Sequence, residues 1–299
     1  MLSKNEVHSL VVTLRCSSAL SVMGSTAMII DILKSGNVRK QCRLRILMGV
    51  SIFDIMSSSA FFMGPWLTEK TPAGEYYGLS SYGNYYTCQA QGFFVSITVG
   101  SYCYNVCLAI FYVLAVKYSK TENWLKKKIE PWMHITSLSY SLTIFIAMLQ
   151  FGFSAYANRY RWCFPNGENE YAEIIMFRFS EVIIWLISIL MIVMYRAVKE
   201  QQKIVESYSS QNARRSRAGQ SRKVARQCFA FSASFYIAYV PVMIESHLNL
   251  DEPLYPLTLV LHLCVPLQGF LNAVVYFLPR IVMHLTNFKN KVSTQAVSE

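Results

Sequence analysis

The chain has 299 residues, of which 53% are hydrophobic and only 15% are charged, and its formal net charge is +11. The apolar residues gather in runs of about 20, which is the length that a helix needs to cross a bilayer. This composition argues against soluble domains and predicts an all-α integral membrane protein, a bundle of seven transmembrane helices.

Seven candidate spans follow one another along the chain. They cover residues 10–33, 44–67, 88–116, 131–157, 171–195, 224–247 and 255–278. A tail of residues 1–9 precedes this domain, which we take as residues 10–279, and residues 280–299 follow it. We expect the first span to serve as its own insertion signal, because no cleavable signal peptide precedes it. The polar stretch 196–223, between spans five and six, is predicted to be a mobile loop.

Basic residues lie on one side of the predicted bundle. The loops after spans one, three and five, together with the C-terminal tail, hold all Lys and Arg residues except Lys4, Arg15, Lys70, Arg159, Arg161 and Arg178. Short cytoplasmic loops are enriched in Lys and Arg, so we expect an outside N-terminus and an inside C-terminus. The same charge would attract anionic inner-leaflet lipid, which makes membrane lipids the expected partner and argues against nucleic acid.

The last span ends in a change of character at Pro279 and Arg280, where the apolar sequence turns basic. Beyond it, Ile281, Leu285 and Phe288 recur at helical spacing and would share one face. We therefore expect the last span to stop at Pro279. A short amphipathic helix would then lie on the inner membrane surface.

Two of the eight cysteines are placed on the outer side by this topology. Cys88 opens the third span, and Cys163 lies in the outer loop between spans four and five. An oxidising compartment favours a disulfide between them, with two free thiols as the alternative. The chain has no CxxC sequence, so a zinc or redox site is not expected, and we expect no metal or other cofactor.

Polar side chains also lie at membrane depth. Asp54 falls in the middle of span two, where an ionisable group costs a few kcal/mol. It must therefore face inward, and Ser25, Asn105 and Asn272 are available at similar depth, with Tyr276 one turn beyond Asn272. We interpret these five as a buried polar network that can hold two arrangements. A purely structural hydrogen-bonded cluster is the alternative, and the sequence does not separate the two.

Taken together, these features resemble the G-protein-coupled receptors. Asp54 matches the acidic position of the family's second span, and Asn272 and Tyr276 have the spacing of its Asn-Pro-x-x-Tyr motif, with Ala273 in place of Pro. Ser25 stands where the family usually has Asn. The paired cysteines and the inner amphipathic helix fit the same pattern, and the resemblance covers nearly the whole chain.

Span six adds a further match, because Tyr239-Val240-Pro241 resembles the family's aromatic-x-Pro switch. One departure is clear: Val113 stands where rhodopsin-like receptors have their Asp-Arg-Tyr triplet, and Lys117 is a candidate replacement one turn later. This absence, the Leu-Asn-x-x-x-Tyr sequence of span seven and the Trp-Cys-x-Pro sequence in the loop of Cys163 are more similar to the cyclic-AMP-receptor-like receptors of protists and fungi.

The resemblance implies an extracellular ligand site in the outer half of the bundle and a heterotrimeric G protein on the inner side. Inward-facing candidates for the ligand site are Gln91, Val95, Val99, Arg178, Glu181, Met243, Glu245 and His262, beside Tyr239. Two of these, Arg178 and Glu181, are three residues apart and could instead pair with each other. Candidates for the face toward the G protein are Lys117, Arg222, Lys223, Arg226 and Arg280.

The sequence also bears on three other functions. A retinal protein is strongly disfavoured because residues 255–278 contain no Lys for a Schiff base. A seven-span hydrolase is disfavoured, since the five His residues are scattered and no HExxH or GxSxG occurs. A transporter or channel is the more serious alternative: Gly64, Pro65, Pro241 and Pro266 interrupt the spans, although no internal repeat accompanies them. We expect a non-enzymatic receptor that crosses the plasma membrane several times.

Overall fold

The computed structural model describes residues 2–68, 81–149, 153–155, 162–165, 170–207, 212–248 and 254–297, most of them helical. The α-helices are α1 (Lys4–Lys34), α2 (Cys42–Met63), α3 (Tyr85–Ser96), α4 (Thr98–Val116), α5 (Glu122–Lys128), α6 (Glu130–Leu149), α7 (Glu170–Ser207), α8 (Asn212–Leu248), α9 (Tyr255–Cys264) and α10 (Gln268–Val297). A 3-10 helix, Gly64–Leu67, continues α2. Two short antiparallel strands, β1 (Phe153–Ala155) and β2 (Cys163–Pro165), complete the described elements.

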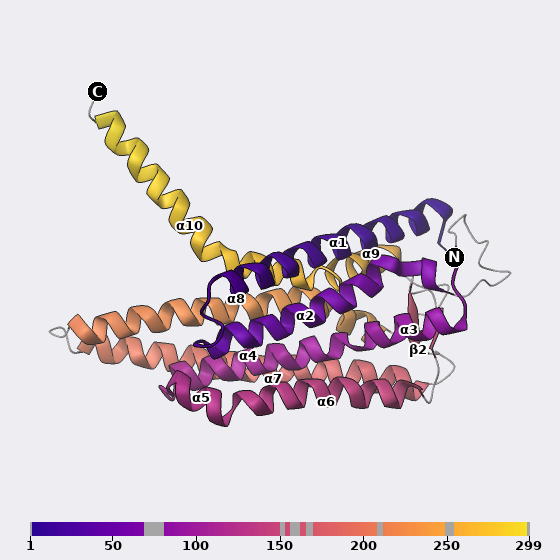
Figure 1. Cartoon of the computed structure of the whole chain (residues 1–299), viewed down its shortest axis with the longest axis horizontal. Coiled ribbons are helices and arrows are strands. Elements are labelled where there is room, and N and C mark those ends of the chain that lie inside the picture. Colours follow the sequence, from indigo (N-terminus) through magenta and orange to yellow (C-terminus); the bar gives the residue numbers. More distant parts are fainter. Residues whose placement is uncertain are drawn as a thin grey trace.

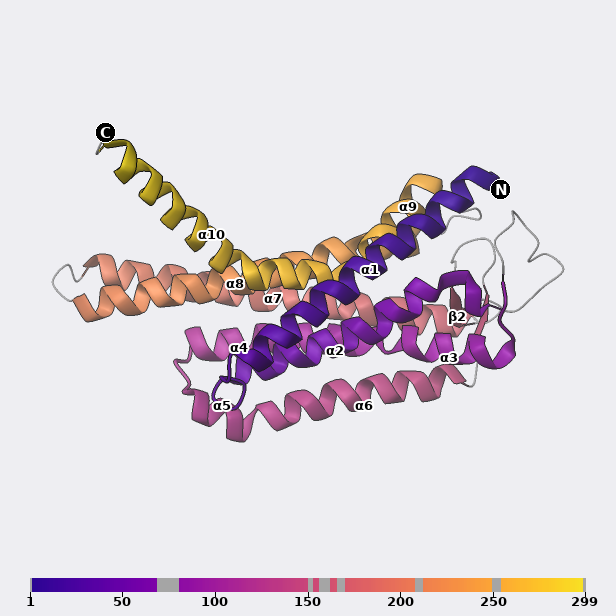
Figure 2. The ribbon, with the colours of Figure 1, turned by 45° about the horizontal axis from the view of Figure 1, so that its top comes forward.

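The long helices run side by side along the length of the molecule (Figures 1 and 2). The α4 helix is central and packs against α2, α6, α7 and α8, whereas α1 packs against α2, α9 and α10. The C-terminal part of α10 leaves the bundle at an angle, as the yellow ribbon in Figure 1 shows. The α4 helix is therefore bordered on several sides by other helices of the bundle.

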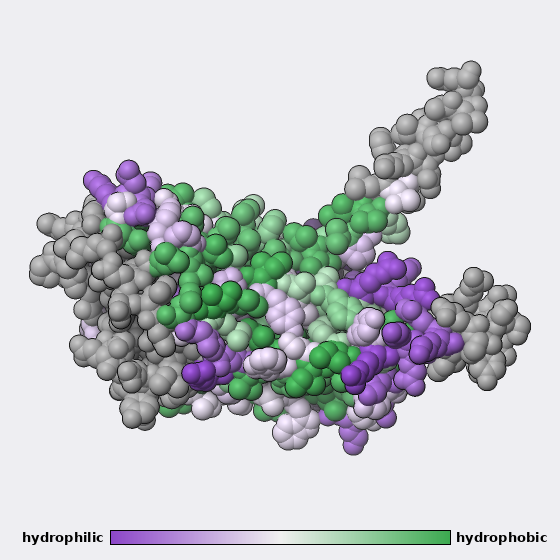
Figure 3. Space-filling model, turned by 180° about the vertical axis from the view of Figure 1, so that it is seen from behind, coloured by the Kyte–Doolittle hydropathy of each residue, from purple (hydrophilic) through white to green (hydrophobic). Residues whose placement is uncertain are grey.

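The surface of the bundle supports the prediction of a membrane protein. Five helical stretches are long and apolar enough to cross a bilayer: Lys4–Lys34, Cys42–Leu67, Tyr85–Val116, Arg178–Glu200 and Arg222–Leu248. The pair formed by α9 and α10 makes a sixth if it counts as one bent span. Hydrophobic residues gather over the middle of the bundle, and hydrophilic ones lie toward its ends (Figure 3). The α6 helix covers the fourth predicted span and is not among these six.

Several predicted boundaries need correction. The tail 1–9 is helical from Lys4, because Ser3 and Glu6 form a capping box in which each side chain bonds the other residue's backbone. The fourth predicted span is too long, since residues 153–155 form a strand rather than a helix. The predicted mobile loop 196–223 is largely helical: α7 extends to Ser207 and α8 begins at Asn212. Lys, Arg, Gln, Glu and Ala are good helix formers, so a polar stretch can continue a helix into water.

The seventh predicted span is bent by 52° between α9 and α10. Pro266 lies in this break, and a proline lacks the N–H that a helix interior requires. At Pro279 the opposite occurs, because α10 continues through it to Val297. The short helix that we expected after the span is therefore continuous with it, and the expected stop at Pro279 is wrong.

Candidate functional site

A single buried carboxylate joins four helices at the centre of the bundle. Asp54 of α2 is 2% exposed, and its Oδ1 accepts a hydrogen bond from Ser101 Oγ of α4 at 2.7 Å. Its Oδ2 accepts one from Asn272 Nδ2 of α10 at 3.0 Å. Asn272 Oδ1 in turn accepts from Ser234 Oγ of α8 at 2.9 Å. We call Asp54, Ser101, Ser234 and Asn272 the central network, and two neutral donors satisfy its carboxylate.

The structure thus brings Asp54 and Asn272 together, as the sequence predicted, but two other predicted members, Ser25 and Asn105, make no described hydrogen bond to either of them. Ser25 is fully buried, and its Oγ has no hydrogen-bond partner among the described residues. Asn105 donates to the carbonyl of Ser101, one turn earlier in its own helix, at 2.8 Å. It also lines a narrow void between α4, α7 and α8 that is too small for a water molecule.

Tyr276 belongs to a second cluster at the end of α1. Its hydroxyl donates to Asp31 Oδ2 at 2.7 Å, and Arg280 Nη1 donates to both carboxylate oxygens of Asp31. We call Asp31, Tyr276 and Arg280 the α1–α10 clasp. Four helical residues rise about 6 Å, so the phenol of Tyr276 reaches the end of α1 while Asn272 reaches Asp54.

Serine side chains repair the broken backbone between α9 and α10. Ser21 Oγ of α1 accepts a hydrogen bond from the backbone N–H of Gly269 at 3.0 Å. Ser58 Oγ of α2 lies within hydrogen-bonding distance of both Ser21 Oγ, at 2.9 Å, and the carbonyl oxygen of Pro266, at 3.2 Å. At membrane depth an unpaired backbone group is costly, and Ser side chains can pair with it instead. A break in span seven is therefore tolerated because α1 and α2 supply hydroxyls.

The same repair continues one turn earlier on α1, and the packing around the break leaves no spare room. Ser17 Oγ donates to the carbonyl of His262 at 3.0 Å. At Gly269, an added Cβ would lie 2.2 Å from Ser25 Oγ and 3.0 Å from Asp54 Cβ. The start of α10, just after the break, is therefore packed directly against the side chain of Asp54, which links the geometry of span seven to the central network.

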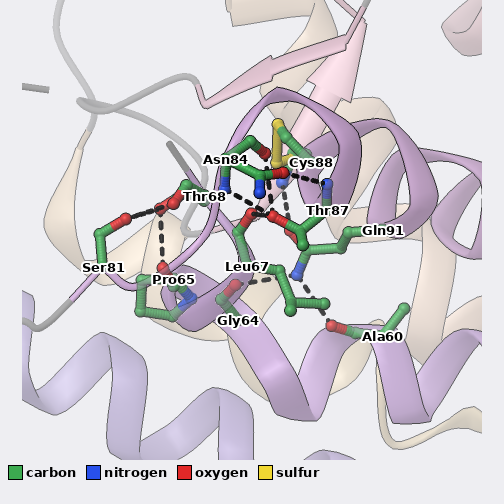
Figure 4. Close-up of a disulfide and its surroundings, with 11 residues drawn as sticks. Ala60, Gly64, Pro65, Leu67, Thr68, Ser81, Asn84, Thr87, Cys88 and Gln91 are labelled. Carbon is green, nitrogen blue, oxygen red and sulfur yellow. Dashed lines mark hydrogen bonds between the residues drawn. A yellow bond between two sulfur atoms is a disulfide. The ribbon is translucent and has the colours of Figure 1, made fainter. Parts of the chain in front are cut away.

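The structure confirms the predicted disulfide between Cys88 and Cys163, which lies at the predicted outer end of the bundle. Figure 4 shows Gln91 beside this bond, one turn further along α3. Gln91 Nε2 donates to the carbonyls of Ala60, at 2.9 Å, and Gly64, at 2.8 Å, while its Oε1 accepts from the backbone N–H of Cys163 at 2.9 Å. The amide we predicted to contact a ligand is occupied by these three contacts within the chain.

Trp162 fills the space beside this disulfide at the same end of the bundle, which we call the mouth of the bundle. It is 5% exposed, and its ring packs edge-on against Phe61 at 4.9 Å and lies 5.1 Å from the ring of His262. Val95 belongs to the same buried cluster, and Val99 lies in the main core. In this arrangement a loop side chain therefore occupies the region where we expected the ligand.

The remaining candidates for the ligand site divide into two groups. Arg178 pairs with Glu181 at 3.0 Å and is 65% exposed, which matches the alternative of a self-satisfied ion pair. His247 also approaches Glu181, at 3.5 Å. Glu245 is buried, and Met243 is half-buried against the core.

The predicted span-six switch lies deeper. Tyr239 is fully buried, with ring centroids 4.2 Å from Tyr102 and 4.8 Å from Phe235. Pro241 lies inside α8 two residues later and removes one backbone donor from that helix. The aromatic cluster thus connects α8 to the central helix α4, close in sequence to Ser234 of the central network.

At the opposite end, the candidates for the G-protein face lie on the surface. Lys117, Arg222, Lys223 and Arg226 are exposed, whereas Arg280 is engaged with Asp31. A neighbouring ion pair escaped prediction: Arg45 of α2 donates to both carboxylate oxygens of Glu130, at the start of α6. Burial favours the neutral acid, but the hydrogen bond and charge of Arg45 outweigh it and lower the pKa of Glu130.

The serines that complete the central network and repair the break between α9 and α10 were not predicted from the sequence. A signal was present, because Ser17, Ser21 and Ser25 follow one another at four-residue spacing and so line one face of α1. Ser101 and Ser234 carried no such pattern. Among the described residues, no group of three or more His, Cys, Asp or Glu side chains is arranged to hold a metal ion.

No protein-family model and no curated protein sequence matches this chain. Its function must therefore be argued from the central network, the broken span and the two ends of the bundle.

Proposed function

We propose that this chain is a seven-span receptor of the G-protein-coupled kind, with α6 as its fourth span. It lies in the plasma membrane with its N-terminus outside, and it transmits an extracellular ligand signal to a heterotrimeric G protein. One observation carries the proposal: the carboxylate of Asp54 connects α2, α4, α8 and α10 through Ser101, Asn272 and Ser234. Ionisable groups at membrane depth are costly and usually functional.

The contact between α8 and α10 is the element that can have two states. Ser234 donates to Asn272 across this contact, and the aromatic ring of Tyr239, on the same helix, packs against α4. A movement of α8 would exchange the Ser234–Asn272 bond for new partners near the void lined by Asn105 and Ser232. A ligand would shift this equilibrium only to the extent that it binds one arrangement more tightly.

The outer end supplies a way for a ligand to act. Trp162 sits in the mouth, between Phe61 and the ring of His262, and the disulfide ties its loop to α3. A ligand that displaces this ring would act on α9, and through the break at residues 265–267 on Gly269 and Asn272. The inner end offers exposed cations on α4 and α8, among them Lys117, Arg222 and Arg226, to an acidic G-protein surface.

The test is basal nucleotide exchange on a panel of heterotrimeric G proteins, with the full chain in bilayer nanodiscs. Ser234→Ala removes the hydroxyl that links α8 to Asn272, and we expect it to raise basal exchange several-fold at unchanged protein amount. Thr143→Ala is the matched control, because Thr143 is exposed on α6 and donates to Ser139 of its own helix. If neither the wild type nor folded Ser234→Ala protein accelerates exchange on any G protein, the proposal fails.

A transporter or channel is the second candidate, and the broken span favours it. Discontinuous helices with repaired backbone at membrane depth are a feature of transporters, and the 52° bend between α9 and α10 lies beside Asp54. Proteoliposome flux of a panel of small cations and amino acids distinguishes the two. Solute movement that Asp54→Asn abolishes, without any effect on G proteins, would select the transporter.

A further inference from the structure

A polar cavity of about 230 Å³ opens at the predicted inner end of the bundle. It lies between the end of α1, the start of α2, the inner half of α8 and the middle of α10. The polar residues that line it are Ser35, Asn37, Gln41, Arg43, Gln227 and Arg280. No acidic residue is among the described lining side chains, although Arg280 is held from the side by Asp31. The cavity therefore presents positive charge.

Hydrogen-bond donors dominate this lining. Arg43 donates through Nη1 to Gln227 Oε1, so the Gln227 amide keeps its two N–H donors for another partner. Each guanidinium carries five N–H donors, of which these contacts and the bonds to Asp31 use a part. The first turn of α2 also begins beside Gln41, but its positive helix end is already met by Glu122, whose carboxylate accepts a hydrogen bond from the Cys42 N–H at 3.1 Å. An anion with several acceptor oxygens would meet matching donors from three helices.

The surroundings indicate how such an anion would arrive. Large apolar side chains are exposed near the cavity on two of the four helices that border it: Ile30 and Leu33 on α1, and Leu278 and Ile281 on α10. These apolar side chains would face the lipid tails on either side of the polar cavity. The cavity itself would then lie at the level of the lipid headgroups. Basic pockets between spans at the cytoplasmic surface suit lipid phosphates.

We propose that this cavity binds the phosphate-bearing headgroup of an anionic membrane lipid, with the acyl chains along α1 and α10. Arg43 and Arg280 hold the phosphate, and Gln227 donates to it from α8. Bound lipid then bridges α2, α8 and α10 and stabilises the packing of these three helices that the structure shows. This inference does not depend on the receptor proposal, since any helical bundle with this cavity would share it.

The experiment uses the full chain in phosphatidylcholine nanodiscs, with and without a small fraction of phosphatidylinositol bisphosphate. Retained lipid is counted by native mass spectrometry, and the unfolding temperature is measured in parallel. We expect the phosphoinositide to be retained and to raise the unfolding temperature. Because each basic residue near a membrane surface contributes roughly 1 kcal/mol, Arg43→Gln should weaken retention about fivefold.

Two further variants keep the result decisive. Gln41→Glu adds negative charge to the cavity at the start of α2, where an acid stabilises the helix, so this protein should fold yet retain less lipid. Lys120→Gln removes an exposed inner charge away from the cavity and should retain lipid like the wild type. Equal loss with Lys120→Gln would mean diffuse attraction and overturn the proposal. So would absence of retention, or equally tight binding of free inositol phosphate or of an acidic peptide in place of lipid.

Discussion

Arg280 donates to both carboxylate oxygens of Asp31, at 2.7 and 2.8 Å, and so fastens α10 to the end of α1. The bond lies just beyond Pro279, where the chain continues as a helix that leaves the bundle. Tyr276 shares the same carboxylate, so the clasp spans the turn that contains the proline. The ion pair therefore ties α10 to α1 at the C-terminal end of α1.

The first prediction concerns that clasp. Arg280→Gln should release α10 around Pro279 and speed amide hydrogen exchange there, measured by mass spectrometry in nanodiscs. The loss of stability should be small, below about 1 kcal/mol, because Arg280 and Asp31 are both partly exposed to solvent. The charge-swapped double variant, Asp31→Arg with Arg280→Asp, should slow the exchange again. Failure of the swap to do so would show that the charges are not what holds α10.

The second prediction compares two changes in the central network: removal of a hydrogen-bond donor to Asp54, and removal of the charge of Asp54 itself. Asn272→Ala leaves the buried carboxylate of Asp54 with one of its two described donors, which should cost about 1–3 kcal/mol of stability. Asp54→Asn removes the charge at nearly constant volume, and burial of a charge is itself unfavourable, so this variant should unfold at or above the wild-type temperature.

Thermal unfolding in detergent micelles measures both variants. The double variant should resemble Asp54→Asn more than Asn272→Ala, since no unpaired charge remains. If Asp54→Asn proves as unstable as Asn272→Ala, then the carboxylate contributes net stability. The reading of it as a costly, functional group would then be wrong.

The third prediction tests the packing of the broken span. Gly269→Ala would place a methyl group 2.2 Å from Ser25 Oγ and 2.6 Å from Ser21 Oγ, and overpacking of this kind costs about 1–3 kcal/mol. Ser25→Ala in the same chain removes the nearer oxygen and should recover part of that loss. Gly219→Ala is the control: nothing lies within 4 Å of its Cβ, and Ala favours a helix over Gly by about 0.5–1 kcal/mol. Equal effects of the two Gly variants would contradict the described packing.

The sequence predicted the positions of five long apolar helices and of the bent pair α9 and α10, because lipid requires an apolar surface and the composition of each segment reflects that requirement. It also predicted that Asp54 would find a polar partner, since an unpaired carboxylate at that depth is too costly. The break near Pro266 was visible only as a proline. Pro279, of the same type, does not end its helix, and the difference depends on the neighbours that repair the backbone.

Those neighbours are serines, and serine gives an ambiguous signal within a span. Ser51 and Ser141 each donate to a carbonyl of their own helix four residues earlier, and any serine in a helix can do so. Ser21 and Ser58 bond across helices instead. The choice depends on which helix packs alongside, and this is information about tertiary structure. For a similar reason the sequence did not predict that Trp162 occupies the expected ligand region: a loop side chain has no periodic pattern from which its position could be inferred.

The last prediction concerns the amide of Gln91 at the outer end. Gln91→Leu keeps the size of the side chain but leaves the carbonyls of Ala60 and Gly64 and the N–H of Cys163 without that partner. Each buried group left unpaired costs about 1–3 kcal/mol, so the variant should unfold well below the wild-type temperature even with its disulfide intact. Non-reducing gels report whether the disulfide has formed. Gln91→Glu offers a sharper comparison, since its oxygens can still accept from Cys163, whereas its carboxylate has no donor and its protonated form can donate to only one of the two carbonyls. The unfolding temperature of Gln91→Glu should therefore rise as the pH falls. A Gln91→Leu protein as stable as the wild type would show that these three hydrogen bonds add nothing to the disulfide, which ties the segment of Cys163 to α3.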